Sequence, residues 1–187
     1  MTNKLITKFV DSDEELAQIS KLSSVNQLAN LTDGTKEKEG FVTWLYTIDI
    51  LKTLHKISPS IIVKDGDQVV GYALVLLEES AEYYEPFRKT LEILSPVIYK
   101  NKPLSDYQYY FMGQICVDLD YRGQGIVNLL YQFHKEQLSP YYNFLVTEIS
   151  VNNPRSQRAH EKVGFKTIYI SEDETDRWNV VLWDWLA

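Results

Sequence analysis

Two glycines stand where an expected strand ends and a helix begins, in the run Ile115-Cys116-Val117-Asp118-Leu119-Asp120-Tyr121-Arg122-Gly123-Gln124-Gly125-Ile126-Val127. The first backbone N–H groups of a helix have no intrahelical partner, and the macrodipole adds about half a positive charge there. Glycine lacks the Cβ atom that would hold an anion away. The run therefore predicts a cradle for phosphate or pyrophosphate. The alternative is an ordinary strand-to-helix turn in which glycine supplies a positive φ.

Two other phosphate-binding loops are excluded by the same residues. The sequence holds no GxxxxGK[ST] pattern, which excludes a P-loop. Gly123-Gln124-Gly125 lacks the third glycine of GxGxxG, because Ile126, Val127 and Asn128 follow it. A Rossmann dinucleotide site is therefore excluded as well.

A second chemically suggestive segment runs from Ser150 to Phe165. On a helix, Ser156 and His160 are four residues apart and share a face, and Asn153 is placed to cap the start of that helix. Three hydrogen-bonding side chains then lie together beside the preceding strand. The alternative is a well-capped amphipathic helix in which His160 is a partly buried polar residue.

Basic residues gather in and just after this segment, in a chain of formal net charge −7. They are Arg155, Arg158, Lys162 and Lys166, with Glu161 as the one acidic residue among them. A local positive patch suits a phosphorylated ligand, although a solvated helix face carries such charges as well.

The elements that must position these residues follow from apolar spacing and from capping and turn signals. Asp65-Gly66 between two apolar runs predicts a hairpin, and Ser12 with Glu15 forms a capping box. The expected strands are Leu5–Val10, Ile61–Val63, Val69–Leu77, Tyr107–Val117, Phe144–Val151, Phe165–Ile170 and Trp178–Leu186. The expected helices are the one after Ser12, Phe41–Ile57, Gly123–Leu138 and Asn153–Val163, with a loop at Asn30–Gly40 and a helix-plus-loop segment at Ala81–Pro103.

The two chemical segments, in this order and in this context, resemble the GNAT N-acetyltransferases, which move an acetyl group from acetyl-CoA to an amine. The family's motif [Arg/Gln]-x-x-Gly-x-[Gly/Ala] is matched from Arg122, except that Val127 stands at its last position and could crowd one pyrophosphate contact. Its later pattern, Asn-x-x-[Ala/Ser]-(x)3-[Tyr/His]-Glu-Lys-x-Gly-Phe, is matched by Asn153 through Phe165.

The resemblance implies an α/β fold with a mixed, mostly antiparallel central sheet of about seven strands, flanked by helices on both faces. Residues 1–187 would form a single N-acetyltransferase domain with a helical insertion near 81–106.

The resemblance also implies where acetyl-CoA binds. The pyrophosphate would lie on the N–H groups of Gln124 to Val127, and the pantetheine arm would pair with strand Tyr107–Val117 where it is wedged away from Phe144–Val151. The expected cofactor residues are Ile115, Cys116, Val117, Arg122, Gly123, Gln124, Gly125, Ile126, Val127, Asn153 and Ser156. No metal is expected, since backbone dipoles and basic side chains neutralise the phosphates.

Catalysis in this family needs a donor to the thioester oxygen and a proton for the leaving thiolate. The Val117 N–H is the candidate donor. His160 stands where many family members have a tyrosine that acts as the general acid. An imidazolium of ordinary pKa about 6.5 can protonate a thiolate whose thiol has a pKa of about 8.5. His160 is thus the candidate general acid, unless it is structural and water gives the proton.

The acceptor amine must also lose a proton, because an alkyl ammonium has a pKa near about 10. Glu148 is the candidate base, with Glu78 and Glu79 as further options, and a carboxylate on a strand is otherwise a solvated face residue. Gln114 stands where many family members have a glutamate, and an amide cannot take the proton. Cys116 is expected to be a small buried hydrophobe rather than an acyl-cysteine nucleophile.

The composition of the chain excludes several other classes of protein. The 26 acidic residues outnumber the 19 basic ones, which argues against a general nucleic-acid binder and permits a cationic acceptor. A single cysteine cannot form an intrachain disulfide and points to a reducing compartment. Residues 1–13 contain no apolar signal segment, and the longest apolar run, Val69–Leu77, is about half the ~18 residues of a membrane helix. A cytoplasmic protein is expected.

The acceptor is expected to be a primary amine of a small molecule or peptide, walled by Phe41–Ile57 and by residues 81–106. Thirteen tyrosines suit either a core edge or such a wall. Strand Trp178–Leu186 is expected at a sheet edge, where it could form a homodimer. The alternatives are a catalytically inactive CoA-binding sensor or scaffold module and an interaction protein that merely uses the fold.

Overall fold

The computed structural model describes residues 4–27 and 42–186. The expected loop Asn30–Gly40, and Phe41 at the start of an expected helix, lie outside the described residues. Seven strands form one sheet in the order β1-β2-β3-β6-β7-β9-β8. Their bounds are β1 Ile6–Phe9, β2 Ile61–Asp65, β3 Gln68–Leu76, β6 Tyr109–Val117, β7 Phe144–Ser150, β9 Arg177–Asp184 and β8 Lys166–Glu172.

Every neighbouring pair of strands in this sheet is antiparallel except β6 and β7, which run parallel. A parallel pair needs a crossover connection, and here α5 (Ile126–Leu138) supplies it. The mixed, mostly antiparallel sheet expected from the resemblance is confirmed.

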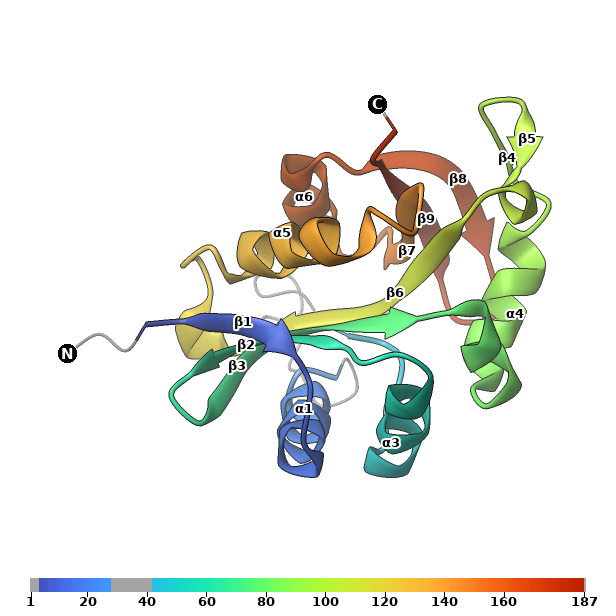
Figure 1. Ribbon diagram of the computed structural model, residues 1–187. Helices are drawn as coiled ribbons and strands as arrows, with labels where there is room; N and C mark the ends of the chain where they lie inside the picture. The colour runs from blue at the N-terminus through green and yellow to red at the C-terminus, as the bar shows by residue number, and fades with distance from the viewer. Residues whose placement is uncertain (1–3, 28–41, 187) are drawn as a thin grey trace.

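Helices cover both faces of the sheet (Figure 1). On one side, α1 (Asp13–Val25), α3 (Ile48–Ile57) and α4 (Glu85–Leu94) contribute to one buried apolar cluster. On the other, α5 and α6 (Pro154–Val163) border a second cluster. Successive strand residues alternate between them: Ile62 and Tyr72 belong to the first cluster, and Ile61 and Ala73 to the second.

Local sequence signals place several element ends correctly. The Ser12 side chain accepts a hydrogen bond from the Glu15 N–H at the start of α1. Asn153 caps α6 by accepting from the Ser156 N–H, and Gly164 ends that helix with φ 118°. The Asp65-Gly66 hairpin joins β2 to β3. These signals act over three or four residues and need no tertiary contact.

The helix expected from Phe41 to Ile57 is corrected by the structure. The helix α3 begins only at Ile48, where the Thr47 side chain caps it by accepting from the Ile50 N–H. Upstream, Trp44 stacks on Phe111 with ring centroids 6.0 Å apart. The apolar spacing of that stretch comes from an irregular segment packed on the sheet, which has no helical period.

The expected edge position of Trp178–Leu186 is wrong. The strand β9 lies between β7 and β8 and pairs with both of them. The outer strand is β8, whose side chains are mostly exposed. The high apolar content of β9 is therefore explained by its interior place in the sheet.

The segment between β3 and β6 contains α4, two short 3-10 helices at Glu78–Glu82 and Leu104–Asp106, and a two-stranded ribbon, β4 (Ile98–Tyr99) with β5 (Lys102–Pro103). Phe87 of α4 packs on Phe111 of β6 with ring centroids 5.3 Å apart. This contact holds α4 beside the sheet, where it meets β7.

Candidate active site

The two parallel strands, β6 and β7, are hydrogen-bonded to each other at one end only. Tyr109, Tyr110 and Phe111 of β6 face Phe144, Leu145 and Val146 of β7. Next to this pairing, the Thr147 hydroxyl donates to the Met112 carbonyl oxygen over 2.8 Å. Beyond that point each strand continues without pairing with the other, and two adjoining cavities lie along the gap. The wedge expected from the resemblance is therefore present.

The larger cavity, the basic groove, has a volume of about 430 Å³ and lies between the end of β6 and the starts of α5 and α6. Arg122, Arg155, Arg158 and Lys162 line it, and among its described lining residues none is Asp or Glu. All the expected cofactor residues line this groove except Gln124. The Gln124 amide instead donates to the Asp120 carbonyl oxygen over 2.9 Å.

The glycine turn forms one wall of the basic groove. Gly123 and Gly125 have φ values of 77° and 82°, and a Cβ at either would meet no atom within 4 Å. Glycine is needed here for the left-handed backbone, so this part of the ordinary-turn alternative is correct. The same turn opens α5 at Ile126, and its first N–H groups lack intrahelical partners. The turn can therefore hold an anion as well.

Arg122 links this wall to the opposite side of the sheet. Its Nε donates to the Val117 carbonyl oxygen over 3.2 Å, and its Nη2 donates to Asn26 Oδ1 over 2.5 Å. Asn26, at the end of α1, also lines the groove. Sequence reasoning missed Asn26, because only tertiary contact brings residues 96 positions apart together.

The exposed edge of β6 presents backbone groups to the groove. The Asp118 N–H donates to Val70 of β3 over 2.9 Å. Because successive N–H groups of a strand point to opposite edges, the Val117 N–H points away from β3 and toward the gap. Cys116 is buried, and burial raises the pKa of its thiol to about 12. The thiol stays protonated at neutral pH, which argues against an acyl-cysteine.

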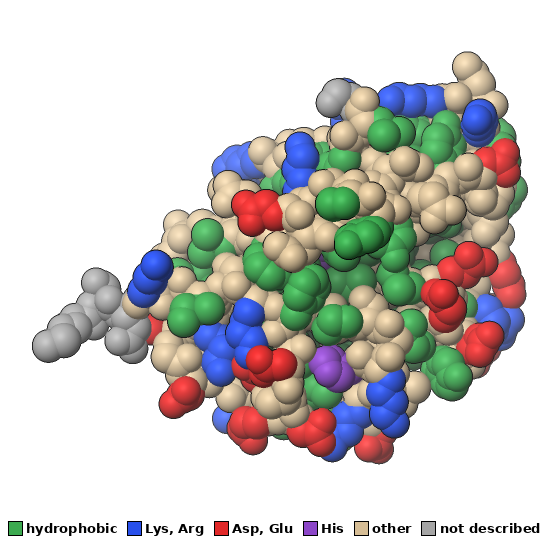
Figure 2. All heavy atoms as spheres, in the orientation of Figure 1, with side chains coloured by type: hydrophobic (Ala, Val, Ile, Leu, Met, Phe, Trp, Pro, Cys, Tyr) green, Lys and Arg blue, Asp and Glu red, His purple; other side chains and the backbone are tan. Residues whose placement is uncertain are grey.

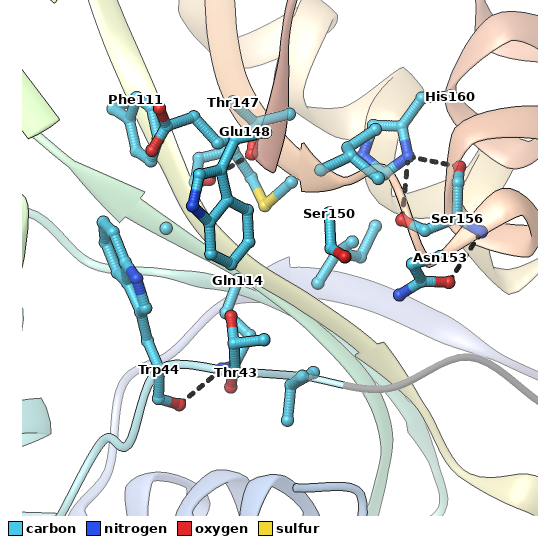
Figure 3. Close-up of a pocket in the computed structure, with 16 residues that line it drawn as sticks. Thr43, Trp44, Phe111, Gln114, Thr147, Glu148, Ser150, Asn153, Ser156 and His160 are labelled. Carbon is cyan, nitrogen blue, oxygen red and sulfur yellow. Dashed lines mark hydrogen bonds between the residues drawn. The ribbon is translucent and has the colours of Figure 1, made fainter. Parts of the chain in front are cut away.

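The smaller cavity, the Glu148 pocket, has a volume of about 70 Å³ (Figure 3). Trp44, Phe111 and Trp178 supply aromatic walls. Glu148 of β7 accepts hydrogen bonds from the Ser171 hydroxyl over 3.0 Å and from the Thr90 hydroxyl over 3.1 Å. Glu78 and Glu79, the other candidate bases, are exposed and line neither cavity.

Burial raises the pKa of the Glu148 carboxyl, and the nearby charge of Asp173 raises it further, while the two hydroxyl donors oppose the shift. A carboxyl whose pKa moves toward neutrality is a better match for proton transfer than an ordinary surface carboxyl. Thr90 belongs to α4, so the segment expected to wall the acceptor pocket helps to hold this carboxylate. The expected helix wall is replaced by Val42, Thr43 and Trp44, which precede α3.

His160 lies on α6 and lines both cavities. Its Nδ1–H donates to the Ser156 carbonyl oxygen over 2.8 Å, and its Nε2 accepts from the Tyr131 hydroxyl over 2.6 Å. Burial lowers the pKa of the imidazole to about 4. The assumption of an ordinary pKa is therefore wrong for this residue, and at neutral pH the ring has no proton to give as an imidazolium.

The Gln114 side chain makes three hydrogen bonds. Its Oε1 accepts from the hydroxyls of Ser23 and Tyr72 over 2.8 and 2.5 Å, and its Nε2 donates to the Trp44 carbonyl oxygen over 2.9 Å. The Tyr72 and Ser23 donors match an amide oxygen, and the Trp44 acceptor matches an amide N–H. Gln114 thus holds the Trp44 segment against the sheet and is not a base.

The site combines a glycine turn at the start of a helix, a basic groove and a parallel strand pair that is only partly hydrogen-bonded. These features are typical of a protein that binds a phosphorylated, extended ligand. The family model for the acetyltransferase (GNAT) family matches residues 25–165. The chain belongs to this family, and the family supports acetyl transfer as its general activity. No curated protein matches the sequence.

Solved structures show the same fold at low sequence identity. A GNAT-family acetyltransferase from Streptococcus agalactiae is 16% identical with a TM-score of 0.65, covering 96% of this chain and 95% of that one. A putative acetyltransferase from Salmonella typhimurium, solved with its cofactor acetyl-CoA, is 15% identical with a TM-score of 0.63, covering 97% and 94%. The ribosomal-protein-S18-alanine N-acetyltransferase of Escherichia coli is 12% identical with a TM-score of 0.61, again covering 97% and 94%.

Residues 4–27 and 42–186 lack two features. None of the helices there has the length and apolar character to cross a membrane. Within those same ranges, no three or more His, Cys, Asp or Glu side chains come together in a way that would hold a metal ion.

Proposed function

We propose that the protein transfers the acetyl group of acetyl-CoA to a primary amine by direct attack, with the cofactor in the basic groove and the amine in the Glu148 pocket. The observation that carries this proposal is the meeting of the two cavities at Ile115, Asn153 and His160. A thioester reaching along β6 from the groove would present its carbonyl group at the mouth of the pocket.

The basic groove supplies what the cofactor needs. The first N–H groups of α5 bind the pyrophosphate, and Arg155, Arg158 and Lys162 meet the outer phosphates. The open edge of β6 between Ile115 and Val117 pairs with the amide groups of the pantetheine arm as an added strand would. Asn153 and Ser156 lie on the opposite wall. This chain therefore binds the cofactor through dipoles and fixed charge.

Glu148 serves as the general base. It takes the proton that the ammonium must lose, and the amine nitrogen attacks the thioester carbon to form the C–N bond. The C–S bond then breaks, and the nitrogen gives its second proton to water. The Val117 N–H donates to the oxygen on which negative charge develops. The thiolate leaves and takes a proton from water, since buried, neutral His160 is assigned no proton transfer.

The test is an acetyl-CoA consumption assay over a panel of primary amines, read as release of free CoA thiol. The proposal expects amine-dependent turnover and a rise in Tm when acetyl-CoA is added, because a ligand at 100 times its Kd stabilises the fold by about 2.7 kcal/mol. A Tm rise without turnover of any amine would support the inactive CoA-binding module instead. If acetyl-CoA at millimolar concentration leaves Tm unchanged, the cofactor assignment fails.

A further inference from the structure

The Glu148 pocket differs from the basic groove in the charges that line it. Among its described lining residues, Glu148 is the acidic side chain, and no Lys or Arg lines the cavity. A substrate carboxylate or phosphate beside the reacting amine would enter without a cationic partner and next to a carboxylate. Burial of an unpaired charge is strongly unfavourable, so the charge pattern selects against amines with an adjacent anion.

Aromatic rings surround the place where the amine would lie. Trp44 and Phe111 stack with ring centroids 6.0 Å apart and planes inclined by 17°. Trp178 is fixed from the β8–β9 side, where its indole N–H donates to Asp173 over 3.1 Å. A cation over such faces is attracted by the ring quadrupole, and its methylene groups pack on the rings. An ammonium on an apolar chain satisfies both requirements.

The size of the pocket adds a third restriction. A volume of about 70 Å³ holds roughly five to seven water-sized groups, at about 10–15 Å³ for each one. That space matches a small amine in size and leaves little room for large substituents on the carbon that bears the amine.

We infer that the acceptor is a primary amine at the end of an unbranched alkyl chain, with its reacting nitrogen on a methylene carbon and no anionic group beside it. This inference rests on the proposed function. Free alkyl diamines and the side chain of lysine share this chemistry, whereas α-amino acids and bulky cyclic amines do not.

The experiment compares matched amines with acetyl-CoA and the full chain. Norleucine is 1-aminopentane with a carboxylate on the amine-bearing carbon, and norleucinamide keeps the branch without the charge. We expect kcat/KM for 1-aminopentane to exceed that for norleucine at least tenfold, with norleucinamide between them. Comparing 1,5-diaminopentane with Nα-acetyl-lysinamide separates a free diamine from a lysine side chain as the source.

Two variants test the aromatic wall. Trp44→Leu should raise KM for 1-aminopentane about threefold to tenfold through loss of the cation–π contact, with kcat less affected. Tyr141→Leu, at an aromatic residue that is 72% exposed, is the matched control and should change neither constant.

The outcomes separate the two proposals. If amines are acetylated but norleucine is used as well as or better than 1-aminopentane, the acceptor inference is overturned and acetyl transfer stands. An unchanged KM in Trp44→Leu would also count against the inference. If acetyl-CoA raises Tm and no amine is acetylated, the proposed function itself fails, and the acceptor inference fails with it.

Discussion

The basic groove and the Glu148 pocket share the gap between β6 and β7, and five residues line both: Val42, Ile115, Asn153, Ser156 and His160. On one side of this border, four cations and a helix start surround a volume of about 430 Å³. On the other, one carboxylate and aromatic rings surround about 70 Å³. The contrast indicates that one wedge in a sheet can hold two ligands of opposite charge end to end.

One outer face of the molecule (Figure 2) does not show the separation of charge found in the two cavities. On the face shown in Figure 2, Lys and Arg side chains lie among Asp and Glu side chains, and hydrophobic side chains gather across the middle. The separation of charge therefore belongs to the two cavities and is not a property of this face as a whole. Variants that change one cavity and leave the other intact test whether the two cavities have separate functions.

The largest effect is expected from Glu148→Gln. An amide of the same size keeps the shape of the pocket but takes no proton, so kcat/KM should fall by about 10²–10⁴. The Tm rise caused by acetyl-CoA should persist, because the groove is unchanged. Glu79→Gln, at an exposed carboxylate outside both cavities, is the control and should keep full activity. An E148Q enzyme within threefold of the parent would remove Glu148 from the mechanism.

The groove is tested by Gly125→Ala. A left-handed backbone costs an L-residue about 1–2 kcal/mol, so the turn should lose stability and present its N–H groups less well. We expect the Kd for acetyl-CoA, measured by calorimetry, to rise about tenfold if 1.4 kcal/mol of binding is lost. Gly66→Ala is matched, since Gly66 has a φ of 57° in the β2–β3 hairpin. It should cost similar stability and leave cofactor affinity intact; equal Kd changes in both variants would contradict the role of the turn.

The pH dependence of kcat/KM reports on the Glu148 carboxyl. The base must be ionised, so the rate should fall as pH drops through the raised Glu148 pKa. In Thr90→Val the carboxylate loses one donor that favours its charged form, so its pKa should rise and the acidic limb should move to higher pH. Thr53→Val, on the exposed face of α3, is the control. If the acidic limb of the pH profile does not move in T90V, a group other than Glu148 controls that limb.

The smallest effect on rate is expected from His160→Phe. Because the neutral ring gives no proton at pH 7, kcat should change less than about threefold, whereas a general acid would supply about 10²-fold or more. Stability should fall by about 1–3 kcal/mol, because the buried Tyr131 hydroxyl loses its acceptor. A hundredfold loss of kcat with unchanged Tm would restore His160 as the acid.

His160 also carries a pH signature in unfolding. Its folded pKa is about 4, below the ordinary value of 6.5, so the unfolded chain binds the proton more readily. Stability from this group is therefore complete above pH 6.5 and falls as pH drops from 6.5 toward 4. Chemical unfolding at several pH values should show this loss in the parent and a smaller loss in H160F.

Much of this molecule was predictable from local signals. The caps at Ser12, Asn153 and Gly164 and the Asp65-Gly66 turn depend on side chains within a few residues of each other, so their outcome follows from sequence spacing. The glycine turn before α5 belongs to the same class. Together with the Asn153–Phe165 pattern, it indicated the family and the wall of the basic groove.

What the tertiary structure decided lies where distant residues meet. The low pKa of His160 and the raised pKa of Glu148 both arise from burial by packed elements, which disfavours the charged form of each group. Arg122 is anchored by Asn26 at the end of α1. The interior place of β9 likewise depends on strand order. Spacing along a chain sets turns and helix ends, but desolvation and charge pairing depend on which elements pack together, and that is settled only when the whole sheet forms.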